Sequence, residues 1–170
     1  MNTRLITLSL IALLGLGSMG ASGSIPPGQQ KKLLEQQHQA LVQEELTLGQ
    51  TFRQLRDQTQ SLLEQLRALN PKGGTTKDWM TLWQDYHQYK VSDSEKDKDV
   101  YEDKYKDKLE DLEPKHGEHA FKSQVKTLLT ALEATVPQWQ ALAQSWAVHN
   151  QKKQQLNKDK QNFNQKNGKN

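Results

Sequence analysis

The sequence predicts an all-α protein, an elongated helical bundle built on two long antiparallel helices. Three observations support this fold class. Leucine recurs at every seventh position from Leu34 to Leu69, which is the spacing that returns a side chain to the same face of an α-helix. The chain is rich in Gln, Lys and Leu, which favour helices. No run of alternating apolar and polar residues indicates a β-strand.

Residues 1–23 have the features of a secretory signal peptide. Arg4 provides a positive charge, and an apolar stretch follows it from Leu5 to Leu16. Ala21 and Gly23 then meet the small-residue rule for cleavage. The apolar stretch is shorter than the roughly 20 residues that a membrane-spanning helix needs. We therefore expect a periplasmic or extracellular protein, and an uncleaved N-terminal anchor is the alternative.

The first long helix is predicted over about residues 29–70. Its leucine row is continuous, whereas the second row of the same repeat is apolar only toward the C-terminal end. Such a seam must be covered, either by a helix of the chain's own bundle or by another subunit. In the second case Leu34, Leu41 and Leu48, in the more polar N-terminal half, are candidate partner-binding residues.

A helical insert at about residues 71–117 separates the two long helices. A proline and two glycines end the first helix, and Thr75 with Asp78 forms a capping box that starts the next one. That helix places Trp79 and Trp83 on one apolar face. Tryptophans at this spacing are most often core anchors. The alternative is an exposed adhesive patch, so both are also candidate partner-binding residues.

The second half of the insert, residues 96–113, is dense in charges of both signs, which indicates a solvated helix. Its carboxylates do not follow the D-x-[DN]-x-[DN]-G order of a calcium-binding loop. His116 and His119 lie near glutamates, but they do not form an H-E-x-x-H motif. We therefore predict that the protein has no metal site.

The second long helix is predicted from His119 to Asn150. We expect a kink or a short break between Thr135 and Pro137, because a proline inside a helix removes one hydrogen bond. An antiparallel course would bring this helix back along the leucine row. It would then cover that row with Val125, Leu129, Leu132, Trp139 and Trp146.

Residues 151–170 consist mainly of Asn, Gln and Lys, and we expect them to form a flexible basic tail. Such a tail could touch an anionic membrane or the acidic segment of a neighbouring molecule. Arginine and aromatic residues are scarce there, which argues against specific nucleic-acid binding. The predicted organisation is a signal peptide at 1–23, a bundle domain at 24–150 and a tail at 151–170.

The chain carries no recognisable catalytic signature. We find no phosphate-binding loop, nucleophile elbow, zinc-binding motif or dinucleotide fingerprint. The absence of cysteine excludes disulfides, thiol catalysis and thiolate metal sites. We therefore predict that the protein is not an enzyme and that it binds no cofactor.

Three features occur together: a cleavable signal, a Gln- and Leu-rich long helix, and a shorter aromatic insert before a returning helix. The residues that carry them are Leu66-Arg67-Ala68-Leu69-Asn70, then Trp79, Trp83, Tyr86 and Tyr101-Glu102-Asp103, and finally Ser123 to Leu132. This layout resembles the minor pilus subunits of conjugative type IV secretion systems, the TrbJ-like group, although the chain is shorter than those subunits usually are. The resemblance implies an exported helical bundle at a pilus tip or in its assembly path.

These features lead us to expect a secreted helical interaction protein of a cell-envelope assembly. Its partners would be envelope or pilus proteins held by helix packing, with a homo-oligomer as a further possibility. A periplasmic holding chaperone is an alternative, since those proteins are also basic, helical and secreted, and they grip clients between coiled-coil arms. A second alternative is a membrane-anchored envelope factor that keeps its N-terminal segment.

Overall fold

The computed structural model describes residues 25–114 and 118–167, so the predicted signal segment lies outside the described residues. The described part is all-α, as predicted, and contains no strand. Its helices, in chain order, are α1 (Pro27–Ala68), α2 (Thr76–Val91), α3 (Glu95–Leu112), α4 (Glu118–Glu133) and α5 (Val136–Asn167).

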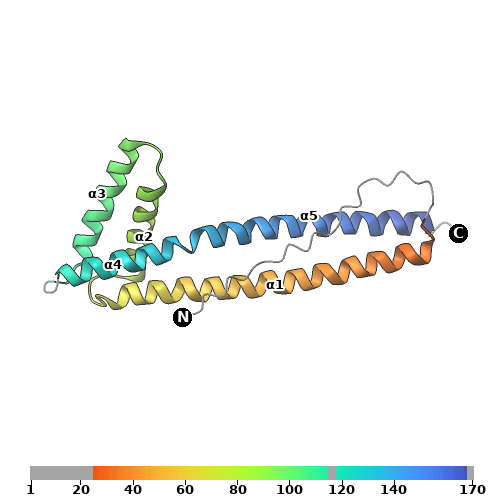
Figure 1. Cartoon of the computed structure of the whole chain (residues 1–170), viewed down its shortest axis with the longest axis horizontal. Helices are drawn as coiled ribbons and strands as arrows, with labels where there is room; N and C mark the ends of the chain where they lie inside the picture. The colour runs from red at the N-terminus through yellow and green to blue at the C-terminus, as the bar shows by residue number, and fades with distance from the viewer. Residues whose placement is uncertain (1–24, 115–117, 168–170) are drawn as a thin grey trace.

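Two long helices set the shape of the molecule. α1 and α5 lie side by side and run in opposite directions, which gives the molecule the form of a rod (Figure 1). α4 continues roughly in line with α5, and the α2–α3 hairpin stands off at that same end (Figure 1). We call α1 up to Thr59 together with α5 the arm. The last turns of α1, from Leu62, together with α2, α3 and α4 form the head.

The head encloses the main hydrophobic core. Apolar residues spaced three or four apart on α2 and α4 turn toward the end of α1 and toward α3, and they bury one another. Trp79 packs its ring edge-on against Phe121, with 6.3 Å between ring centroids. The buried members of this core are Leu66, Trp79, Leu82, Tyr86, Leu109, Leu112, Phe121, Val125, Leu129 and Leu132.

The turn between α1 and α2 is fixed by close packing and by a helix cap. A Cβ atom added at Gly73 would lie 2.8 Å from the Leu112 carbonyl oxygen, a backbone atom, so a larger residue there would push the end of α3 away from the turn. The predicted capping box is confirmed: the Thr75 backbone N–H donates to Asp78 Oδ2 at 2.8 Å. The side chain of Asn70 also donates to the Leu112 carbonyl at 2.8 Å, which ties the turn to the end of α3.

The predicted break in the second long helix is confirmed. α4 ends at Glu133 and α5 begins at Val136, so that Pro137 lies in the first turn of α5, where its missing N–H costs no helical hydrogen bond. The buried Thr135 spans the break, and its carbonyl accepts the first bond of α5 from the Trp139 N–H at 3.0 Å.

The expectation of a flexible tail is wrong for residues 151–167. α5 continues as a helix to Asn167, and residues 168–170 lie outside the described part of the chain. The physical reason is burial: Leu156 is buried and Phe163 is half-buried against Leu34 and Leu41 of α1. Two apolar side chains seven residues apart are enough to continue the seam through a polar segment.

Within the described residues, we find no helix with an apolar stretch of the length needed to cross a bilayer.

Candidate functional site

The arm is an antiparallel two-helix seam with a repeat of seven on both sides. On α1 the buried row is the set of leucines 34, 41, 48 and 55. The facing row on α5 steps through Leu142, His149, Leu156 and Phe163. Leu48 and Leu55 pack with Leu142, and the half-buried side chains of Trp139 and Trp146 flank them. Each step along α1 is therefore met by a reverse step along α5, as in a coiled coil.

His149 interrupts the apolar row of the arm. Its side chain is only 1% exposed, although it stands where the repeat places a leucine. The ring Nδ1 lies 3.3 Å from Glu44 Oε2, and Nε2 lies 3.6 Å from Glu45 Oε2. Trp146 packs edge-on against the ring at 5.7 Å between centroids. His149, together with Glu44 and Glu45, thus forms a polar step that separates the apolar contacts on either side of it.

Two lysines complete this polar step. Lys152 Nζ lies 2.8 Å from Glu44 Oε1, and Lys153 Nζ lies 3.3 Å from Glu45 Oε2. Burial raises the pKa of Glu44, but hydrogen bonds from Lys152 and His149 outweigh that effect, so its pKa lies below the usual value. Glu44 therefore stays ionised through the neutral range and holds α5 in register with α1.

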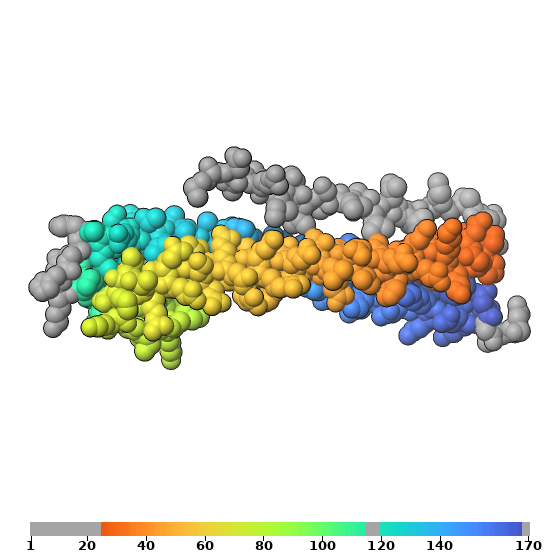
Figure 2. Space-filling model, turned by 90° about the horizontal axis from the view of Figure 1, so that it is seen from below, coloured from red at the N-terminus to blue at the C-terminus, as the bar shows by residue number. Residues whose placement is uncertain are grey.

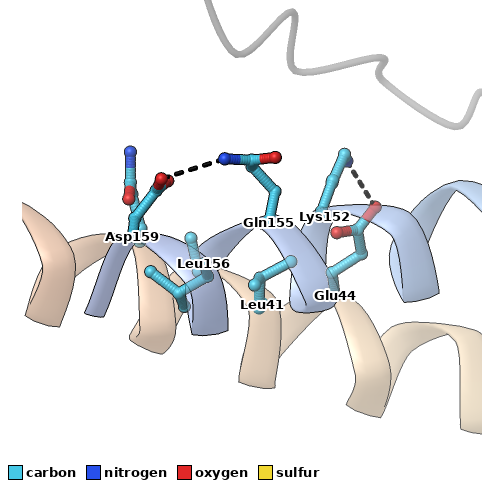
Figure 3. A pocket seen from close by; sticks show the side chains of 8 residues that line it. Leu41, Glu44, Lys152, Gln155, Leu156 and Asp159 are labelled. Carbon is cyan, nitrogen blue, oxygen red and sulfur yellow. Dashed lines mark hydrogen bonds and ion pairs between the residues drawn. The ribbon is translucent and has the colours of Figure 1, made fainter. Parts of the chain in front are cut away.

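A groove opens beside this step, between the two helices of the arm (Figure 3). Its volume is about 290 Å³, at the lower limit of small-molecule pockets, which span roughly 300–1,000 Å³. The Lys152–Glu44 ion pair and a hydrogen bond from Gln155 to Asp159, at 2.9 Å, lie along it (Figure 3). The residues that line the groove are Gln37, Ala40, Leu41, Glu44, Lys152, Gln155, Leu156 and Asp159. The groove suits an apolar side chain of a partner helix better than a whole ligand.

A second polar cluster joins α2 to the end of α4 in the head. Glu133 accepts a hydrogen bond from Trp83 Nε1 at 3.0 Å, and its other oxygen lies 2.8 Å from His87 Nδ1. Among the described residues, no three His, Cys, Asp or Glu side chains lie in an arrangement that could hold a metal ion. We interpret the Glu133 cluster as a structural tie between the two helices.

The residues predicted to bind partners lie mostly inside the chain. Leu34, Leu41 and Leu48 are buried against α5, which agrees with packing inside the chain's own bundle. Trp79 is buried in the head, and Trp83 is half-buried at the junction with α4. A partner-binding role for these five side chains stays a prediction.

The groove residues on α5 are the ones that sequence reasoning missed. They are Lys152, Gln155, Leu156 and Asp159, all in the segment expected to be a tail. Leu156 and Phe163 continue the seven-residue spacing that starts at Leu142 and matches the leucines of α1. His149 breaks that row, and the Asn, Gln and Lys residues around it make the segment read as polar. The seven-residue spacing from Leu142 to Phe163 was the sequence signal that could have predicted a helix through this segment.

Comparison with known proteins identifies no relative: no protein-family model matches the chain, and neither a curated protein nor a solved structure matches it significantly.

Proposed function

We propose that this chain is an exported interaction protein of a cell-envelope assembly, of the kind found in conjugative pili. The observation that supports the proposal most is the layout of arm and head. A long Gln- and Leu-rich helix is followed by an aromatic insert and a returning helix, which is the order that resembles TrbJ-like subunits. The proposed role is adhesion or assembly, with no chemistry.

The geometry suits a spacer that presents binding surfaces. With 42 residues at about 1.5 Å per residue, α1 is on the order of 60 Å long, so the arm separates the head from the far end of the rod. The groove along Leu41 and Leu156 lies on the arm, away from the head (Figures 1 and 3). In the proposed role, a helix of a neighbouring subunit places an apolar side chain in this groove.

Export is tested by producing the full chain in cells and sequencing the N-terminus of the fractionated product. We expect a periplasmic or extracellular form that begins close to Ser24. An intact N-terminus in the membrane fraction would instead support an anchored envelope factor, and a cytoplasmic product would contradict export.

Partner binding is tested by photo-crosslinking from the groove in living cells. A crosslinking side chain at Gln155 should capture a pilus or envelope protein, whereas the same group at Val148, an exposed position outside the groove lining, should not. Deletion of the chain should abolish conjugative transfer or pilus attachment. Normal transfer together with no specific crosslink would contradict the proposal.

The open groove also favours a second candidate, a periplasmic holding chaperone. In that case the apolar floor formed by Leu41 and Leu156 would hold segments of unfolded clients. The purified chain would then suppress aggregation of an unfolded membrane protein, and charging the groove at its exposed lining residue with Ala40→Glu would abolish the effect. A pilus component has no such activity.

A further inference from the structure

Gly49 lies in the interior of α1, where the chain's own packing does not require glycine. A Cβ atom added there would meet no other atom within 4 Å among the described residues. Glycine weakens a helix interior relative to alanine, because it gains more freedom in the unfolded chain. The backbone shape is not the reason either, since Gly49 lies within the continuous helix α1. The space beside Gly49 therefore suits something that approaches from outside the chain.

An exposed apolar stripe follows the same side of α1 on both sides of Gly49. Val42, Leu46 and Phe52 are 42%, 52% and 44% exposed, which is high for large apolar side chains. With Gly49 they follow the spacing i, i+4, i+7 and i+10, so Val42, Leu46 and Gly49 share one side of the helix. Phe52 lies at the border between this side and the seam, where its half-exposed ring packs edge-on against Trp139 of α5 at 5.6 Å between centroids. In Figure 2 α1 lies on the face turned to the viewer along most of the rod.

The charges beside the stripe are placed symmetrically around Gly49. Glu45 stands four residues before it and Arg53 four residues after it. The Arg53 side chain turns toward the glycine, since its Nε donates to the Gly49 carbonyl at 3.3 Å. Glu45 is held on this side of the arm by Lys153, yet its side chain remains 47% exposed. Both charges can therefore meet a surface that lies against the stripe.

We propose that two copies of this chain associate through α1, with the two helices crossing antiparallel at Gly49. A twofold axis at Gly49 places Glu45 of each copy opposite Arg53 of the other, and Leu46 opposite Phe52. A parallel arrangement would instead oppose like charges, Glu45 to Glu45 and Arg53 to Arg53. The two glycines at the crossing let the backbones approach closely. This inference does not depend on export or on a pilus role.

The first test compares two glycines in the same helix. Neither Gly49 nor Gly28 has an atom within 4 Å of an added Cβ, but Gly28 lies outside the stripe, at the start of α1. We expect sedimentation equilibrium of the purified chain to show a dimer. Gly49→Leu should weaken the dimer roughly tenfold or more while helix content measured by circular dichroism is kept, and Gly28→Leu should leave it unchanged. A wild-type monomer at all concentrations, or no effect of Gly49→Leu, would overturn the proposal.

The second test uses the symmetry of the charges. Arg53→Glu alone and Glu45→Arg alone should each weaken self-association. In either variant, positions 45 and 53 carry the same sign of charge and face each other at both ends of the contact. A mixture of the two variants should restore dimers, all of them mixed, because every opposed pair is then of opposite sign. Circular dichroism checks that Glu45→Arg keeps the arm helical despite the lost contacts with Lys153 and His149. If the mixture associates no better than either variant alone, the antiparallel crossing is wrong.

The third test uses the absence of cysteine from the chain. A mixture of Leu46→Cys and Phe52→Cys copies should form disulfide-linked mixed dimers under mild oxidation. Leu46→Cys alone should crosslink far less, because in a dimer of this variant the two introduced thiols lie on opposite sides of the crossing point. Efficient crosslinking of Leu46→Cys with itself would indicate a parallel contact and overturn the antiparallel one.

Discussion

The head and the arm show how one repeating helix can be stabilised in two different ways. In the head, the end of α1 is covered by α2 and α4, and its Leu66 is fully buried in a core that all these helices share. In the arm, the same leucine row is covered by α5 alone, and the apolar contacts divide into two small clusters on either side of His149. Because local stability follows the amount of buried apolar surface, the arm should open more readily than the head.

The largest expected effect comes from emptying the head core. Trp79→Ala removes a fully buried side chain that packs against Phe121, and such losses cost about 3–5 kcal/mol. We expect the whole chain to lose stability in urea denaturation, because the head anchors the end of the arm. If Trp79→Ala left stability unchanged, Trp79 would have to serve a partner and not the core.

The matched change in the arm is Leu41→Ala. Leu41 is buried between the helices but lies beside an open groove, so the site can relax, and we expect a loss of about 2 kcal/mol. The loss should be confined to the arm, with faster amide exchange in the first half of α1 and the second half of α5. Equal loss of protection in α2 and α4 would mean that arm and head unfold as one unit.

The histidine step sharpens the comparison, because there the expected change has the opposite sign. His149→Leu would join the two apolar clusters of the arm and remove a buried ring nitrogen, Nε2, that has no hydrogen-bond partner. Glu44 and Glu45 keep their contacts with Lys152 and Lys153, so we expect a gain in stability of about 1 kcal/mol. The arm should then approach the stability of the head in hydrogen exchange. His149→Ala is the control, and it should destabilise by leaving a cavity. Lower stability of His149→Leu would show that the contacts with Glu44 and Glu45 outweigh the burial of the ring.

The smallest expected effect is a response of the head to acid. Hydrogen bonds from Lys108, at 2.9 Å, and then from Thr75 hold the pKa of Asp78 well below its usual value. A carboxyl lowered in this way stabilises the folded state above its unfolded pKa of roughly 3.9 and loses that contribution as the pH falls toward the folded pKa. Thermal unfolding should therefore occur at lower temperature as the pH falls below about 4.

Asp78→Asn tests the origin of that acid response. The variant should be less stable than the wild type at neutral pH and should lose part of the further decrease in acid. Asp107→Asn, a change at an exposed position on the same charged helix as Lys108, is the control and should leave the acid response intact. An unchanged response in Asp78→Asn would assign it to other carboxyl groups.

Features with a local cause could be predicted from the sequence, and features that depend on packing between distant segments could not. The leucine row of α1, the Thr75 cap and the break before Pro137 each follow from residues close together in the chain, and the structure contains all three. The helix beyond Asn150 was missed because only Leu156 and Phe163 are apolar there, and their effect depends on α1 lying alongside.

The groove and the polar clusters were missed for the same reason. His149 and Glu44 are 105 residues apart in the chain, and His87 and Glu133 are 46 apart. Neither pair has a local spacing signal, because each depends on how the helices are placed relative to one another. The leucine row was predicted as a seam, and the structure contains that seam. The groove beside it is completed by α5 residues in the segment expected to be a tail.

Hydrogen exchange along α5, followed by mass spectrometry on the purified chain, tests most directly whether the arm is a folded but weaker extension of the head. We expect peptides from residues 151–167 to exchange more slowly than an unfolded chain and faster than peptides around Leu129 in the head. Exchange of residues 151–167 at the unfolded rate would contradict the covered seam. Protection equal to that around Leu129 would contradict the difference between arm and head.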